Sequence, residues 1–120
     1  MVDDEPELLA ILREHFAPQY EVSTALSGEA AVERFTNARP DAVFLDINMP
    51  GMNGVEVLKR VHALDPAVPV IMVTANTDIH VAEVCLKGGA IGYVPKPFNL
   101  TYMDHMAAMA TDRPGRPRPR

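Results

Sequence analysis

Five polar side chains each follow a short apolar run of the sequence: Asp3, Asp4, Asp46, Thr74 and Lys96. Neighbouring carboxylates can hold a hard divalent cation such as Mg²⁺, which prefers oxygen ligands and keeps some of its waters. With a cation present, a carboxylate can attack a phosphoryl group, and an aspartyl phosphate is a known type of covalent intermediate. A threonine hydroxyl and a lysine ammonium are suited to contact the phosphoryl oxygens. Together these residue types indicate phosphoryl transfer to an aspartate.

Each of these residues also has a simpler explanation when taken alone. Asp3 and Asp4 suit a solvated helix start, since acidic groups there complement the helix dipole. Asp46 and Thr74 suit caps at strand ends, and Lys96 suits an ordinary surface position. The chemical interpretation therefore depends on whether the fold brings all five to one place.

Apolar patterning predicts the elements that would position these residues. The continuous apolar runs at residues 42–45 and 68–73 are typical of strands buried on both faces of a parallel sheet. Residues 20–25 and 91–94 are predicted as two further strands. Apolar residues at helical spacing predict five helices, marked by Leu9 and Phe16, Ala31 and Phe35, Val57 and Val61, Val81 and Cys85, and Met103 and Met106.

The alternation of strands and helices predicts a doubly wound α/β domain with right-handed crossovers. In such a fold the carboxyl ends of the strands meet at one edge of the sheet, where ligands bind. The five polar residues fall at that edge. Their three carboxylates and one ammonium would leave a local charge near −2, which favours a bound cation.

Composition narrows the class of protein. A chain of 120 residues with 48% hydrophobic residues suits one domain with one core. Residues 113–120 hold four of the eleven basic groups, so the other 112 residues carry seven basic and sixteen acidic groups, a formal charge of −9. Such an acidic body is unsuited to direct contact with nucleic acid. A single cysteine excludes an intrachain disulfide. The sequence also lacks an apolar run of about 18 residues, which a membrane-spanning helix would need.

Four segments in this order resemble the receiver domain of two-component response regulators: MVDDEP, FLDINMPGMNG, IMVTAN and GAIGYVPKPF. The resemblance covers about residues 1–110. It implies a flavodoxin-like three-layer sandwich with a five-stranded parallel sheet in the order 2-1-3-4-5. We expect a receiver domain over residues 1–112, followed by an Arg/Pro-rich disordered tail or the start of a linker at residues 113–120.

The resemblance also implies a role for each matching residue. Asp46 is the expected phosphoacceptor. Mg²⁺, for which Mn²⁺ can substitute, is expected to bind Asp4 directly, with Asp3 helping to position it. Asp46 and the backbone carbonyl of Asn48 complete the expected ligand set.

The remaining expected roles concern the phosphoryl group and the switch. Lys96 is expected to contact the phosphoryl group. Thr74 and Tyr93 resemble the pair that moves when the added charge draws the threonine inward. This would repack the face formed by the helix before Gly88, the strand at residues 91–94 and the last helix.

A phosphorylation-controlled signalling switch is the function that this resemblance implies. The expected donor is a histidine kinase or phosphotransfer protein, and the expected reader is an output protein or domain. A cytoplasmic location without direct contact with nucleic acid or membrane is expected, and a phosphorylation-dependent homodimer remains open. A phosphatase or phosphotransferase that acts on external substrates commonly has a second aspartate two residues after its nucleophile, where this chain has Asn48. A phosphorylation-independent interaction module remains the alternative.

The chain departs from the family pattern at its start. Only Met1 and Val2 precede the acidic pair, where relatives usually have several more apolar residues. We therefore expect a truncated first strand. Our hypothesis is that Met1 is an internal strand residue and that a few upstream residues are missing from this sequence.

Overall fold

Three parallel strands form the centre of the sheet in the computed structural model, which describes residues 1–47, 53–74, 79–96 and 99–111. The strands are β1 (Val43–Asp46), β2 (Val70–Thr74) and β3 (Gly92–Pro95), and they lie side by side in that order. Residues of β1 and β2 are almost all apolar and all buried, as expected of strands covered on both faces. The predicted runs therefore form strands, and β3 lies one residue later than predicted.

Within the residues that the structure describes, two isolated bridges extend the sheet beyond β1. Val2 pairs in parallel with Leu45 on one side and with Ala25 on the other. Leu45 pairs with Met72, and Met72 with Tyr93. The order across the sheet is therefore Ala25, Val2, Leu45, Met72 and Tyr93, which agrees with the expected order 2-1-3-4-5.

The prediction of a strand at residues 20–25 was wrong. Only Ala25 of this segment forms a bridge, and the segment forms no strand. The first strand is likewise reduced to the bridge at Val2, as expected of a truncated strand. A strand needs a neighbouring backbone with which to exchange hydrogen bonds. Among the described residues, this segment is joined to its inner neighbour by the Val2–Ala25 bridge and by the hydrogen bond from the Met1 amino group to the Ser23 carbonyl.

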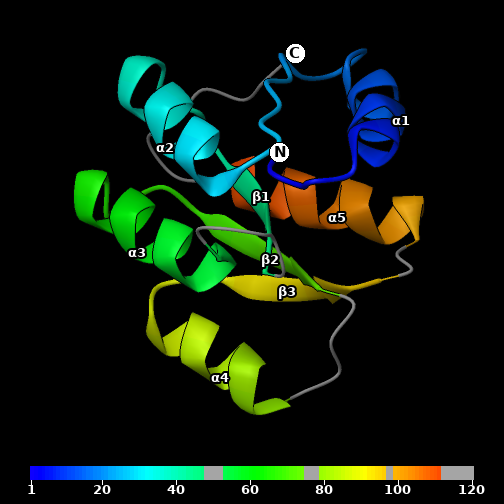
Figure 1. The fold of residues 1–120 in the computed structure, drawn as a ribbon. Coiled ribbons are helices and arrows are strands. Elements are labelled where there is room, and N and C mark those ends of the chain that lie inside the picture. The colour runs from blue at the N-terminus through cyan, green and yellow to red at the C-terminus, as the bar shows by residue number, and fades with distance from the viewer. Residues whose placement is uncertain (48–52, 75–78, 97–98, 112–120) are drawn as a thin grey trace.

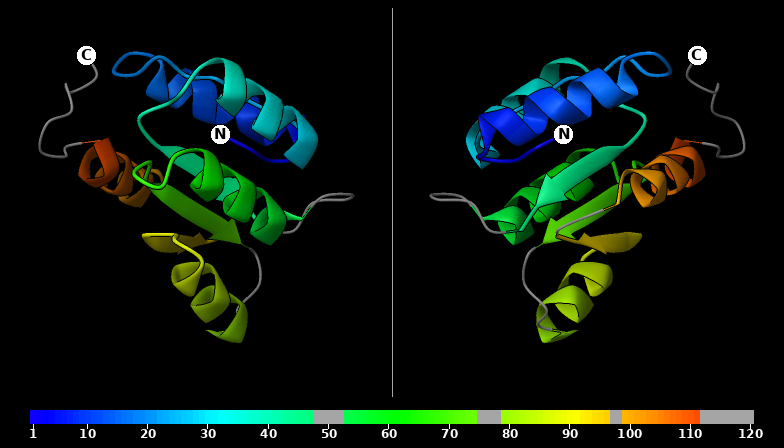
Figure 2. Two further views of the ribbon diagram at one scale, coloured as in Figure 1. Left: turned by 90° about the vertical axis from the view of Figure 1, so that its left-hand side faces the viewer. Right: turned by 90° about the vertical axis from the view of Figure 1, so that its right-hand side faces the viewer.

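In the described part of the chain, five helices flank the sheet (Figures 1 and 2): α1 (Pro6–Phe16), α2 (Gly28–Asn37), α3 (Gly54–Leu64), α4 (Ile79–Lys87) and α5 (Leu100–Thr111). Helices α2, α3 and α4 cover one face, and α1 and α5 cover the other. This gives the three layers expected of the fold. Among the described residues, no helix is long and apolar enough to cross a membrane.

The helix boundaries follow local signals in the sequence. The Ser27 hydroxyl accepts a hydrogen bond from the Ala30 N–H at the start of α2, and the Asn53 side chain accepts one from the Glu56 N–H at the start of α3. Pro6 occupies the first turn of α1, where its missing N–H costs nothing. These caps fix where each helix leaves the edge that carries the polar residues.

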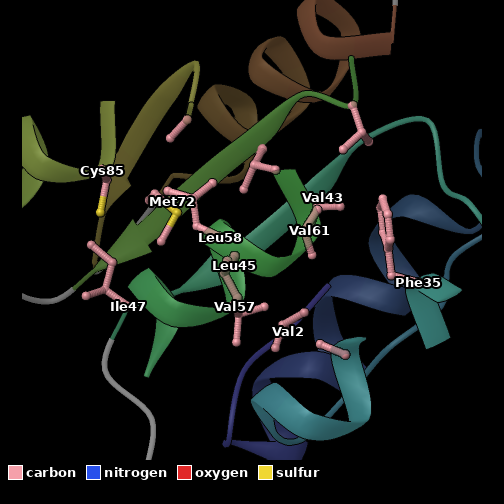
Figure 3. Close-up of a cluster of buried hydrophobic side chains, with 14 of the residues drawn as sticks. Val2, Phe35, Val43, Leu45, Ile47, Val57, Leu58, Val61, Met72 and Cys85 are labelled. Atoms are coloured by element: carbon pink, nitrogen blue, oxygen red, sulfur yellow. The ribbon is translucent and has the colours of Figure 1, made fainter. Parts of the chain in front are cut away.

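Two apolar clusters hold the layers together, one on each face of the sheet. On the α2–α3–α4 face, Val2, Leu45, Val57 and Val61 belong to one cluster of buried side chains (Figure 3). On the α1–α5 face, Phe16, Phe44 and Met103 belong to the second cluster. Each such buried side chain contributes about 1.5–3 kcal/mol. The strand ends that carry the polar residues are therefore anchored on both sides.

Candidate functional site

The carboxyl ends of the strands bring four of the predicted residues to one edge. Asp3 follows the bridge at Val2, Asp46 ends β1, and Thr74 ends β2. Lys96 follows β3, and its backbone N–H donates a 2.7 Å hydrogen bond to the Thr74 carbonyl. The side chains of Asp3, Asp46 and Thr74 are all buried.

The Lys96 ammonium is the centre of the site. Its Nζ atom lies 2.8 Å from Oδ2 of Asp3, 3.5 Å from Oδ2 of Asp46 and 3.5 Å from Oε1 of Glu5. The side chains of Lys96, Asp3 and Asp46 are 15%, 6% and 5% exposed, whereas that of Glu5 is 63% exposed. The predicted convergence of Asp3, Asp46 and Lys96 is thus present in the fold.

The electrostatic environment keeps Lys96 charged. Burial by itself would lower the pKa of the ammonium, but the hydrogen bond to Asp3 and the charges of Asp3, Asp46 and Glu5 outweigh it. The pKa of Lys96 is consequently raised above its ordinary value. The site therefore holds a permanent cation beside the Asp46 carboxylate.

Asp3 is held in place by a second hydrogen bond. Its Oδ1 atom accepts a 3.0 Å hydrogen bond from the backbone N–H of Glu5, while its Oδ2 atom accepts one from Nζ of Lys96. This turn leads directly into α1, so the start of the helix fixes the orientation of the carboxylate.

Asp3, Asp4 and Glu5 form a cluster that could hold a metal ion, since one oxygen of each lies within 4.8 Å of the others. Asp3 is buried, while Asp4 and Glu5 are exposed. Closely spaced carboxylates at the surface match the oxygen ligands and retained waters of Mg²⁺. The donor set therefore fits the expected ion.

Sequence reasoning missed Glu5, which can be explained as an acidic residue at a helix start. Its position directly after the acidic pair was the only signal available in the sequence. The structure adds it both to the acidic cluster and to the partners of Lys96.

Gly54 is a second residue whose role the sequence did not reveal. Its N–H donates a 2.9 Å hydrogen bond to the Ile47 carbonyl. A Cβ atom here would lie 2.3 Å from the Asp46 carbonyl oxygen and 2.6 Å from the Ile47 Cα. Only glycine lets the first turn of α3 approach the end of β1 this closely.

The remaining predicted residues are placed as follows. Tyr93 lies in β3, paired with Met72 and about 40% exposed. Asn48 lies outside the described residues, as do residues 112–120. His15 pairs with Asp104 at 2.7 Å between α1 and α5, away from the site. Cys85 is buried, as expected of a small core residue.

Comparison with known proteins agrees with this geometry. The model of the response regulator receiver domain matches residues 1–108. The transcriptional regulatory protein PrrA of Mycobacterium leprae is 41% identical over 101 residues, which are 83% of this chain and 43% of that protein. Sporulation initiation phosphotransferase F of Bacillus subtilis is 35% identical over 101 residues, which are 83% of this chain and 82% of that protein.

Solved structures show the same fold. A CheY-like receiver domain protein from Methanospirillum hungatei has a TM-score of 0.89 at 28% identity, with 92% of this chain and 90% of that chain covered. The chain spans less than half of PrrA, so it corresponds to one part of that regulator. The matched segment includes every described residue of the site. The chain therefore belongs to the receiver domains of two-component response regulators, which act as signalling switches.

Proposed function

We propose that Asp46 accepts a phosphoryl group from a phosphohistidine of a histidine kinase or phosphotransfer protein. The observation that carries this proposal is the buried Lys96 ammonium, which lies 3.5 Å from the Asp46 carboxylate and 2.8 Å from that of Asp3. A fixed cation at this distance can neutralise a phosphoryl oxygen on Asp46. The similarity to a protein named as a phosphotransferase supports the same chemistry.

The reaction transfers one phosphoryl group without net oxidation or reduction. A carboxylate oxygen of Asp46 attacks phosphorus, the phosphorus–nitrogen bond breaks, and its electron pair leaves with the imidazole of the donor. The product is an aspartyl phosphate. Attack of water on phosphorus later releases inorganic phosphate and restores the carboxylate, so the chain acts only on its own phosphorylation.

The residues proposed to hold Mg²⁺ are Asp3, Asp4, Asp46 and the backbone carbonyl of Asn48, and Mn²⁺ can substitute. When bound, the ion supplies positive charge that offsets repulsion between the carboxylates and the incoming phosphoryl oxygens. Support comes from the cluster of carboxylate oxygens within 4.8 Å at Asp3, Asp4 and Glu5. Lys96 supplies the complementary charge from the side of β3.

Thr74 and Tyr93 are proposed as the switch. Thr74 ends β2 next to Asp46 and is buried, so its hydroxyl can turn toward a phosphoryl oxygen. Tyr93 lies on the neighbouring strand and is partly exposed, so its ring has room to move inward. The added charge of about −1.5 to −2 drives the change.

The proposed output surface is the α4–β3–α5 face. Large apolar side chains are exposed there, among them Leu86, Ile91, Tyr93 and Tyr102. The partner could be an output protein, an output domain or a second copy of the chain. If it binds the repacked face more tightly, it increases the population of the repacked state. A cytoplasmic location, a receiver domain over residues 1–112 and a tail or linker at residues 113–120 belong to the same proposal.

Phosphorylation with acetyl phosphate and Mg²⁺, followed by intact-mass spectrometry, tests the proposal. We expect one added phosphate on the wild type, none on Asp46→Asn, and one on the matched control Asp41→Asn, whose exposed side chain lies just before the opposite end of β1. If no donor, including a phosphorylated histidine kinase, modifies the folded wild type, the interaction-module alternative replaces the proposal.

A further inference from the structure

Glu5 differs from the other two carboxylates around Lys96 in its exposure. The side chains of Asp3 and Asp46 are buried, whereas that of Glu5 is 63% exposed. Lys96 Nζ donates to Glu5 Oε1 at 3.5 Å, compared with 2.8 Å for its bond to Asp3 Oδ2. A long pair with one partner in water is weak, because solvent screens the charges and competes for the carboxylate. Glu5 is therefore the partner that Lys96 can release most easily.

The Glu5 side chain reaches away from the helix that it begins. Glu5 occupies the N-cap position of α1, yet its side chain makes no capping hydrogen bond to this helix, all of which the structure describes. Serine, threonine, aspartate and asparagine are preferred at an N-cap because their short side chains reach the free N–H groups of the first turn. The longer side chain of Glu5 extends to Lys96 instead. The residue type thus favours the contact with Lys96 over a local contact in the helix.

The backbone of Glu5 is fixed independently of its side chain. Its N–H donates to Asp3 Oδ1 at 3.0 Å, and its carbonyl accepts from the Leu9 N–H at 3.1 Å. A substitution that changes only the side chain leaves both backbone groups in place. The contact with Lys96 can therefore be removed without moving Asp3 or the start of α1.

A phosphoryl group on Asp46 would compete with Glu5 for the same ammonium. Lys96 has three N–H donors, of which the hydrogen bonds to Asp3 and Glu5 use two. Asp46 lies 3.5 Å from the ammonium, and phosphorylation would add a charge of about −1.5 to −2 there. Lys96 can turn a second donor toward the phosphoryl oxygens only by releasing one of its other partners. The exposed carboxylate of Glu5 loses least on release, because water solvates it.

We propose that Glu5 is a positioning residue that holds Lys96 in the unphosphorylated chain and releases it when Asp46 is phosphorylated. This inference rests on the proposed function, because it requires that Asp46 accept a phosphoryl group. On phosphorylation, the Glu5 carboxylate passes into water and the donor that it held turns to a phosphoryl oxygen. Since the pair is present before the reaction and broken during it, Glu5 slows the phosphorylation of Asp46. It has little effect on the later loss of phosphate, which begins with the pair already broken.

Two substitutions of Glu5 in the 120-residue chain test this proposal. Glu5→Gln removes the charge, whereas Glu5→Asp keeps the charge but directs a shorter side chain to the N–H groups at the start of α1. Intact-mass spectrometry over time measures phosphorylation by acetyl phosphate with Mg²⁺. We expect both variants to be phosphorylated roughly two- to fivefold faster than the wild type, which corresponds to the release of one exposed ion pair. The rate of phosphate loss after removal of acetyl phosphate should stay close to that of the wild type.

Glu7→Gln is the matched control, because Glu7 is an exposed acidic residue in the same turn of α1. It should keep the wild-type rate of phosphorylation, and an equal gain in this control would overturn the proposal. A gain in Glu5→Gln without one in Glu5→Asp would also overturn it, because repulsion of the anionic donor would then explain the effect. The melting temperature of Glu5→Asp should rise through the new cap, which separates a faster reaction from a loosened fold.

The ¹³C resonance of the Glu5 side-chain carboxylate gives a second readout. On phosphorylation of the wild type it should move toward its position in unphosphorylated Lys96→Met, where no ammonium holds the carboxylate. A resonance that stays in place would overturn the proposal. Absence of phosphate on the folded wild type would overturn the proposed function and this inference together. A phosphorylated wild type whose rate neither Glu5 variant changes would overturn this inference alone.

Discussion

Lys96 Nζ lies 2.8 Å from Asp3 Oδ2 and therefore forms its shortest ion pair with the residue that begins the acidic cluster. The distance to the phosphoacceptor candidate Asp46 is longer, at 3.5 Å. Asp3 is also fixed by the Glu5 N–H, so it holds the ammonium beside Asp46. A single cation thus lies beside two buried carboxylates and offsets one of their two negative charges.

Substitution Lys96→Met should destabilise the chain in Mg²⁺-free buffer. Removing one partner of a buried ion pair leaves uncompensated charge, and we expect a loss of roughly 3 kcal/mol in the free energy of unfolding. Urea denaturation measures this loss, and added Mg²⁺ should restore part of it. Lys59→Met, at an exposed position of α3, should change the stability by less than about 0.5 kcal/mol. An unchanged free energy of unfolding for Lys96→Met would show that the carboxylates do not need the ammonium.

Mg²⁺ should stabilise the folded chain, because an ion that binds only the native state adds free energy by mass action. At a concentration of 100 times the dissociation constant, the gain is about 2.7 kcal/mol. We expect Asp4→Asn to abolish most of this gain. Glu5→Gln should retain it, since Glu5 lies outside the expected ligand set. Thermal melts with and without Mg²⁺ measure this gain in each variant. A larger loss of the gain in Glu5→Gln than in Asp4→Asn would assign the ion to Glu5 instead.

Gly54→Ala should disturb the site through the backbone. The new Cβ would lie 2.3 Å from the Asp46 carbonyl oxygen, and this backbone atom can move only if β1 and α3 separate. We expect a loss of about 3 kcal/mol or more in the free energy of unfolding and slower phosphorylation of Asp46. Gly92→Ala is the control, because its Cβ would meet only the flexible Met106 Cε at 3.1 Å. Equal losses for the two variants would contradict a specific role for Gly54.

Much of the fold follows from local sequence signals. The runs that form β1 and β2 are continuously apolar and too short for a typical helix, which favours buried strands. Ser27 and Asn53 mark helix starts by their capping side chains. The segment 20–25 failed as a predicted strand for a non-local reason. Its β-forming residues need a partner backbone, and in the described part of the chain this pairing is limited to the bridge between Val2 and Ala25.

The site could be predicted to the level of which residues meet, but not to the level of which atoms pair. Strand ends at Asp46 and Thr74 follow from the apolar pattern, and the parallel topology brings Lys96 to the same edge. The choice of Asp3 over Asp46 as the closer partner of Lys96 depends on side-chain packing and on the turn at Glu5. The close approach of Gly54 depends on the angle of α3 relative to β1, which no local signal encodes.

The Met1 amine should make the stability of the 120-residue chain depend on pH. Burial, and then Arg34, lower the pKa of this amine from 8.0 to about 6 in the folded state. Between these two values the unfolded chain binds more protons, so the free energy of unfolding rises with pH and its contribution is lost as pH falls through about 6. We expect a change of roughly 1–3 kcal/mol across this window. Nα-acetylation should remove that part of the dependence while leaving the histidines unchanged, and identical pH profiles for the two chains would contradict the assignment.

Thr74→Ala should separate phosphorylation from the switch. Lys96 and the carboxylates remain, so Asp46 should still take one phosphate from acetyl phosphate by intact mass. Without the threonine hydroxyl nothing draws the end of β2 inward, and the ring of Tyr93 should keep its solvent exposure. Tyrosine-selective NMR with a soluble paramagnetic agent measures this exposure, which should fall on phosphorylation in the wild type and stay constant in the variant. Tyr20, which follows α1 and lies outside the α4–β3–α5 face, serves as the internal control. A phosphorylated variant in which Tyr93 still becomes protected would remove Thr74 from the switch.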